Sequence, residues 1–289
     1  MRDIDVMVPE EALSAAEATL AKVGYVEDES YRPARWYREH HHHLVPRLDR
    51  ATGVVVEIHR NVVAPNQSFR LDPRGFWQRA QPQSVAGAEV LALSPEDTVI
   101  HLCLHTACDD PFAGKIRSVA DLAQFAARRG SQLKWDAVVE RSVHYGIARF
   151  IHYVLQYAAS ECGLAMPEPA RRTIRDAAAT DPFSDRLLRW IIAFCIFRDD
   201  DRQRVLPDWR LQKACEAMLH AKGSLGRMTA LIGWSPTPCK RSRSSHMSRL
   251  AGRDAVPSRL LRTTGLASSS KSSPTDLSNQ PAGDRKIIG

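Results

Sequence analysis

The sequence lacks any unbroken apolar stretch of about 18 residues, the length that a membrane-spanning helix requires. Its start also lacks the basic residues and apolar run of a secretory signal, because Asp3 and Asp5 stand close to Met1. Apolar residues still make up 44% of the 289 residues, which suffices for one large domain or two small ones. We therefore expect no membrane partner.

Cysteine is present but lacks any spacing typical of a metal or redox motif. The six cysteines lie far apart, with no Cys-x-x-Cys pair and no zinc-type arrangement. Most of them fall in apolar helical patterns, where a free cysteine behaves as a small hydrophobe. A reducing cytoplasm is the simplest setting for such a chain, so we predict a cytoplasmic location.

Excess positive charge is absent from most of the chain. The formal net charge is +7, and residues 236–289 hold ten Lys and Arg against three Asp, which accounts for all of it. Residues 1–235 carry 30 basic and 30 acidic side chains. The Ser- and Pro-rich composition of residues 236–289 predicts a disordered basic tail, and any attraction to nucleic acid concerns that tail alone.

The first 70 residues alternate between strand and helix patterns. Period-two alternation at 3–8 predicts a strand, and a helix follows from Pro9 to the stop signal at Gly24. A second strand is expected at 36–48, a hairpin loop at 49–53 and a third strand at 54–62. We interpret residues 1–70 as a partial α/β (α+β) core.

Helical patterns dominate the rest of the chain. Asp72-Pro73 and Ser94-Pro95 are typical helix starts. Ser94 can cap its helix, and Asp97, three residues later, can bond back to Ser94 in a weaker form of the capping box. Residues 71–93 are expected to connect the α/β core to an all-helical domain at 94–222. The predicted helices lie at 95–108, 116–129, 135–145, 147–162, 168–179, 183–197 and 208–221.

Three carboxylates form the most informative pattern. Asp3 and Asp5, two apart on a strand, share one face, and on the third strand Glu57 shares a face with Val55 and His59. If the two strands are neighbours, Asp3, Asp5 and Glu57 form a cluster that needs a counter-charge, which divalent cations can supply. The competing interpretation is a solvated Asp-x-Asp pair near the N-terminus.

Several segments in a fixed order resemble the uncharacterised nucleotidyltransferase family of bacteria, a branch of the DNA polymerase β-like superfamily. The resemblance covers about residues 1–195. It rests on Arg2-Asp-Ile-Asp-Val-Met-Val8, Val23-Gly-Tyr25, a His-rich strand at His40–His43, Val56-Glu-Ile-His59, Leu93-Ser-Pro-Glu-Asp97, His101-Leu-Cys-Leu-His105, Asp121-Leu-Ala123 and Trp135.

The resemblance implies transfer of a nucleoside monophosphate from an NTP to an unknown acceptor, which could be RNA, a protein or a small molecule. Asp3, Asp5 and Glu57 match the positions that hold Mg²⁺ (or Mn²⁺) in the family. One ion, on Asp3 and Asp5, would orient the triphosphate, and a second, reached by Glu57, would activate the acceptor hydroxyl. The sequence does not indicate an oligomeric state.

Histidines and one arginine complete the candidate site. Arg2, His41 and His59 are the candidate substrate-binding residues. A histidine of the His40–His43 run on the carboxylate face could touch phosphate, or the run could be a polar edge strand. His59 could orient a metal ligand or fill space. His101 and His105 share a helical face; we interpret them as packing residues, with a metal pair as the alternative.

One departure from the family pattern concerns the start of the chain. The superfamily places a Gly-Ser turn about a dozen residues before the Asp-x-Asp, where a helix N-terminus grips nucleotide phosphates. Here Met1 stands two residues before Asp3. We therefore expect a chain that is truncated at its N-terminus and impaired in catalysis. The alternatives are an inactive, nucleotidyltransferase-like binding module and a protein that binds nucleic acid through its basic tail.

Overall fold

A computed structural model describes residues 3–221, apart from 29, 66, 70, 110, 113, 114, 180 and 197–207, together with residues 223 and 226. All of these residues belong to one unit of the chain, which spans Met1–Cys239. Arg2 and the predicted disordered tail at 236–289 lie outside the described residues.

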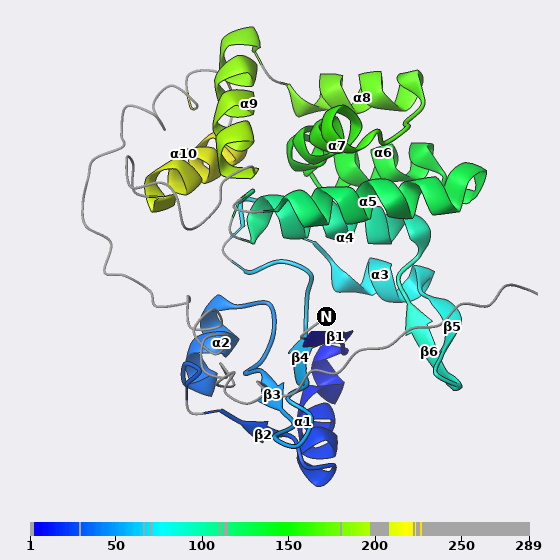
Figure 1. The fold of residues 1–289 in the computed structure, drawn as a ribbon, viewed down its shortest axis with the longest axis vertical. Helices are drawn as coiled ribbons and strands as arrows, with labels where there is room; N and C mark the ends of the chain where they lie inside the picture. Colours follow the sequence, from blue (N-terminus) through cyan, green and yellow to red (C-terminus); the bar gives the residue numbers. More distant parts are fainter. Residues whose placement is uncertain are drawn as a thin grey trace, which may run out of the picture. The chain divides into compact units, whose positions relative to one another are not determined.

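A four-stranded sheet in the order β1-β4-β3-β2 organises the N-terminal part (Figure 1). β1 pairs with β4 in parallel, whereas β3 pairs antiparallel with both β4 and β2. β4 therefore has a partner on each side, and four of its five residues are buried. The elements of this part are β1 (Asp3–Met7), η1 (Glu10–Ala12), α1 (Leu13–Lys22), β2 (Val26–Glu27), α2 (Ala34–His40), β3 (Arg47–Leu48) and β4 (Val55–His59).

One face of this sheet is covered by α1. Leu13 of α1 packs with Leu44 and with Ile58 of β4 in a small buried cluster. Ile58 alternates along β4 with Glu57 and His59, so these two polar side chains point to the opposite face. The packing of α1 thus fixes which face of β4 remains for polar chemistry.

The strand expected at 36–48 is wrong for most of its length. Residues 34–40 form α2, and only Arg47 and Leu48 lie in a strand. Pro33 precedes the helix, Tyr37 is buried, and Arg35 forms an ion pair with Glu39 one turn later at 2.7 Å. These helix-favouring features outweigh the aromatic and histidine content that suggested a strand.

The hairpin loop at 49–53 is confirmed, since Asp49 N–H donates to the Val54 carbonyl and Gly53 adopts a positive φ of 72°. A second hairpin inside the connecting segment was not anticipated. It consists of β5 (Gln81–Val85) and β6 (Ala88–Ala92), joined by Ala86 and Gly87, both of positive φ. Its first strand contains Gln, Pro and Ser, a composition that gives little strand signal.

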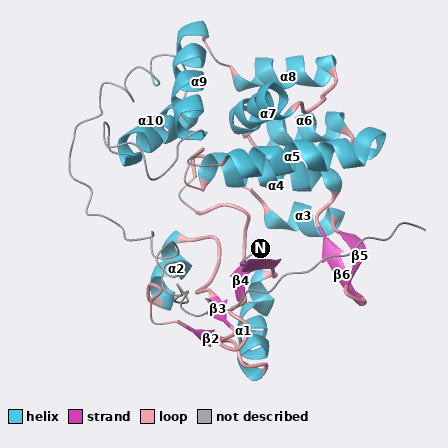
Figure 2. Cartoon of the chain, in the orientation of Figure 1, coloured by secondary structure: helices cyan, strands magenta, loops and turns pink. Residues whose placement is uncertain are grey.

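The helical region agrees closely with expectation (Figure 2). Asp72 and Ser94 both accept hydrogen bonds from backbone N–H groups and so cap their helices, as predicted. The Asp97 carboxylate instead accepts from the Ser94 hydroxyl at 2.9 Å. The helices are α3 (Pro73–Arg79), α4 (Pro95–Cys108), α5 (Ile116–Arg129), α6 (Trp135–His144), α7 (Ala148–Cys162), α8 (Glu168–Ala178), α9 (Pro182–Ile196) and α10 (Asp208–His220), with a 3-10 turn, η2 (Gly130–Gln132), after α5.

The main hydrophobic core lies among these helices. Phe76, Phe112 and Tyr153 are its largest fully buried side chains, and Val62 and Val63 join it from the segment after β4. That segment links the sheet directly to the helical core. Among the described residues, no helix combines the length and the apolar character needed to cross a membrane, and the five described cysteines are free.

Candidate metal centre

The parallel pairing of β1 with β4 places the predicted carboxylates together. Asp5 lies directly opposite Glu57, Asp3 opposite Val55, and Met7 opposite His59. Residues in register on neighbouring parallel strands project to the same side of the sheet. Asp5, Glu57 and His59 therefore share one face, the face that α1 does not cover.

Three of these side chains meet at one point. His59 Nε2 lies 3.3 Å from Asp5 Oδ1 and 3.5 Å from Glu57 Oε2. One ligand atom from each of Asp5, Glu57 and His59 falls within 4.8 Å of the other two, and among the described residues this is the one group of such side chains that could hold a metal ion.

The centre is half open to solvent. The Asp5 side chain is 50% exposed, while those of Glu57 and His59 are 17% and 11% exposed. Burial lowers the pKa of His59, but Asp5 and Glu57 more than offset it, and the pKa is raised to about 9. In return, His59 lowers the pKa of Asp5, against a smaller opposing effect of burial. The carboxylates therefore hold a positive charge beside them.

Two of the predicted site residues, Asp3 and Arg2, are not among the side chains that meet at this point. Asp3 is exposed at the start of β1 and is not part of the group of three, although it projects to the same face as Asp5. Arg2 lies outside the described residues. The structure thus brings together two of the three predicted metal ligands and adds His59, which the sequence suggested as a substrate-binding residue.

His43 contacts Glu57, and the sequence alone did not single out this histidine. Its Nε2 lies 3.4 Å from Glu57 Oε2, and its Nδ1 lies 2.6 Å from the carbonyl oxygen of Leu44. The predicted histidine strand at 40–43 is wrong: His40 ends α2, and His43 makes only an isolated bridge to His59. The histidine run indicated that one of these residues could lie near the carboxylates. Only the path of the chain after α2 shows that His43 is the one that contacts Glu57.

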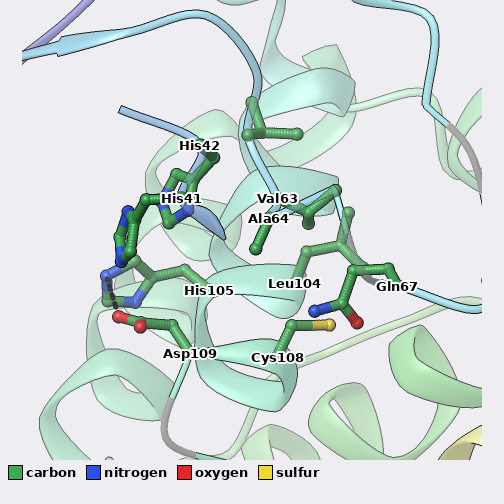
Figure 3. Close-up of a pocket in the computed structure, with 10 residues that line it drawn as sticks. His41, His42, Val63, Ala64, Gln67, Leu104, His105, Cys108 and Asp109 are labelled. Atoms are coloured by element: carbon green, nitrogen blue, oxygen red, sulfur yellow. Dashed lines mark ion pairs between the residues drawn. The ribbon is translucent and has the colours of Figure 1, made fainter. Parts of the chain in front are cut away.

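His41 and His42 face a cavity of about 50 Å³ beside α4, which Gln67, His105 and Asp109 also line (Figure 3). The Nδ1 atoms of both rings are buried and make no hydrogen bond. Burial lowers the pKa of His41 to about 4 and that of His42 to about 2. Both rings are therefore neutral at neutral pH.

Two histidines of α4, His101 and His105, influence Asp5 electrostatically. The charges of His101 and His105 act on Asp5 and lower its pKa slightly. His105 pairs with Asp109 at 3.6 Å, and burial lowers the pKa of His101 to about 4. Neither belongs to the group that could hold an ion.

The donor set fits a divalent cation. As a whole residue His59 is only 9% exposed, and its buried Nε2 makes no hydrogen bond that meets the usual distance and angle limits. Ligands at about 2.0–2.1 Å from one ion lie about 2.8–3.4 Å apart at neighbouring positions of a tetrahedron or octahedron. The separations of 3.3 and 3.5 Å that join His59 to Asp5 and Glu57 are close to this range.

Two adjacent strands thus bring carboxylates together on one face of the sheet, and enzymes that transfer phosphoryl groups use such carboxylates to hold divalent cations. The profile of the family described as "Uncharacterised nucleotidyltransferase" matches residues 1–162, more than half of the chain. The chain belongs to this family. No curated protein and no solved structure shows a significant match.

Proposed function

We propose that the protein transfers a nucleoside monophosphate from an NTP to an acceptor hydroxyl. The acceptor oxygen attacks the α-phosphorus and its proton passes to solvent, while the bond from that phosphorus to the oxygen bridging the β-phosphate breaks and pyrophosphate leaves. The observation that carries the proposal is the register of β1 against β4, which sets Asp5 opposite Glu57 with His59 beside both. Membership of the nucleotidyltransferase family supports the same reaction class.

Each side chain has a distinct role in this proposal. Asp5, Glu57 and His59 would hold a divalent cation at the open side of the sheet. Asp3, exposed on the same face of β1, would serve a second cation that binds together with the triphosphate. When bound, such cations would neutralise phosphate charge and lower the pKa of the attacking hydroxyl. His41 and Arg2 remain the candidate contacts to substrate.

A label-transfer experiment tests the proposal. The protein is incubated with each of the four NTPs labelled at the α-phosphate, with Mg²⁺ or Mn²⁺, and with separated RNA, protein and small-molecule fractions of a cell lysate. Asp5→Asn and Glu57→Gln should abolish transfer. Asp121→Asn, which removes an exposed carboxylate of α5, should leave transfer unchanged and serves as the matched control.

The outcomes separate the proposal from its competitor. Labelling that requires Asp5 and Glu57 supports transfer. NTP binding without labelling of any fraction, by this chain and by a chain extended upstream to include a Gly-Ser element, would favour the inactive binding module. Labelling that persists in both site variants would place the chemistry elsewhere and refute the proposed site.

A further inference from the structure

The imidazole of His59 makes this centre unlike one built from carboxylates alone. His59 follows Glu57 by two positions on β4, so the parallel register that brings Asp5 to Glu57 also brings His59 to both. Oxygen-only ligand sets suit Mg²⁺, whereas ligand sets that include imidazole nitrogen bind first-row transition ions, with affinity that rises from Mn²⁺ toward Cu²⁺. The chemistry of the ligand set therefore bears on which cation is held.

The Nε2 atom of His59 also lacks a hydrogen bond of good geometry, and a cation bound there would replace the proton that the two carboxylates favour. His59 Nε2 is buried against the carboxylates and makes no hydrogen bond, although Asp5 Oδ1 and Glu57 Oε2 are its nearest charged neighbours, at 3.3 and 3.5 Å. A buried polar atom without a hydrogen bond is costly, and a cation shared with the two carboxylates would satisfy it.

A second imidazole reinforces the pattern. Because the Leu44 carbonyl can only accept, the His43 Nδ1 at 2.6 Å from it carries the hydrogen, and in the neutral ring Nε2 keeps a lone pair. That lone pair faces Glu57 Oε2 at 3.4 Å. Two electron-rich atoms in contact are stabilised when a cation lies beside them, and a backbone carbonyl behind a histidine is a common feature of metal sites.

From these contacts we infer that His59 is a direct metal ligand and that the centre selects a divalent transition-metal ion, of the series from Mn²⁺ to Zn²⁺, over Mg²⁺. The inference rests on the proposed function, because it assigns the cation of the same site. His43 lies outside the group of three, so we assign it no ligand role.

The test uses the full chain and the metals alone. Affinities for Mg²⁺ and Mn²⁺ are measured by calorimetry, and pulsed electron paramagnetic resonance of bound Mn²⁺ reports whether a nitrogen is coordinated. His59→Gln should weaken Mn²⁺ binding by at least about tenfold. The same change should alter Mg²⁺ affinity by less than about threefold, because Mg²⁺ takes oxygen ligands. In His59→Gln the paramagnetic resonance signal of the coordinated nitrogen should also disappear.

Two further variants serve as controls. His105→Gln removes a neighbouring histidine outside the group of three, and it should keep both the nitrogen signal and the Mn²⁺ affinity. Asp5→Asn should weaken binding of both ions by at least about tenfold. If His59→Gln fails to fold, the wild-type signal and its loss in Asp5→Asn decide the matter.

Failure of the inference is distinguishable from failure of the proposed function. Metal binding that needs Asp5 but shows no coordinated nitrogen, or the same preference for Mn²⁺ in wild type and His59→Gln, would overturn the inference and leave the transferase proposal standing. Absence of any binding that depends on Asp5, together with loss of label transfer, would remove both.

Discussion

The guanidinium of Arg79 holds the carboxylate of Asp97 in a two-pronged contact, with Nε 2.8 Å from Oδ2 and Nη2 3.0 Å from Oδ1. Asp97 is completely buried and also accepts from Arg141 at 3.0 Å and from the Ser94 hydroxyl. One carboxylate thus joins α3, α4 and α6.

Asp97→Asn should destabilise the protein by about 2–4 kcal/mol, because it leaves two arginines facing a neutral group in a largely dry site. We place the loss of stability at or below the low end of the roughly 3–5 kcal/mol usual for a broken buried ion pair, because both guanidinium groups keep some contact with water. Urea denaturation measures the change, with Asp121→Asn as the exposed control. A loss below about 0.5 kcal/mol, which is ordinary for surface sites, would contradict this account.

Stability should fall with acidity because of His152 on α7. Burial lowers the pKa of this histidine to about 4; Asp185 acts in the opposite direction, while Arg175 and Arg189 add to the lowering. The unfolded histidine, with its ordinary pKa near 6.5, then binds a proton that the folded one does not. The contribution is therefore complete above pH 6.5 and is lost as the pH falls toward 4.

His152→Gln should flatten this part of the stability profile by up to about 3 kcal/mol between pH 6.5 and 4. Chemical denaturation at several pH values measures the slope for wild type and variant. Other buried histidines will keep some slope in the variant, so the difference between the two curves is the quantity to compare. Parallel curves would show that His152 does not titrate with folding.

Asp3 and Asp5 should differ in their effect on metal binding without nucleotide. Asp5 belongs to the group of three, whereas Asp3 is exposed beyond it. Asp5→Asn should weaken Mn²⁺ binding by at least about tenfold. Asp3→Asn should weaken it by less than about threefold, as expected of an exposed charge screened by water.

Both aspartate changes should abolish label transfer, because Asp3 is proposed to act once the triphosphate is bound. Calorimetry with Mn²⁺ alone and the α-phosphate label assay give the two measurements. Equal losses of metal affinity in the two variants would mean that Asp3 is already a ligand in the nucleotide-free protein.

Deletion of residues 236–289 should leave the folded body intact. The sequence of this segment offers too few periodic apolar residues to offset the entropy cost of ordering it. The melting temperature should therefore change by less than about 2 °C on deletion. The deleted chain should also lose any retention on a polyanion column at low salt, since the segment carries the whole net charge of +7. A large drop in melting temperature would mean that the segment contributes to the fold.

Local patterns in the sequence determined the helical part of the protein. Apolar spacing and the capping residues Asp72 and Ser94 predicted the helices after residue 94 to within a residue or two at their ends. These signals suffice because a helix satisfies its backbone hydrogen bonds internally and needs only one apolar face. The segments 34–40 and 81–92 were not predicted correctly, since their local signals were mixed.

Only the tertiary structure decided the site. Alternation along each strand predicted that Asp5 and Glu57 would each lie on a polar face, but no local pattern states which strands are neighbours or in what register. The parallel pairing of β1 and β4 joins residues about 50 positions apart, and it made His59 rather than Asp3 the third member of the group. His43 reached Glu57 because α2 ends at His40 and the chain then turns back toward β4. Such long-range pairing depends on packing over the whole domain. For this reason the sequence indicated the candidate site residues but not which of them lie together.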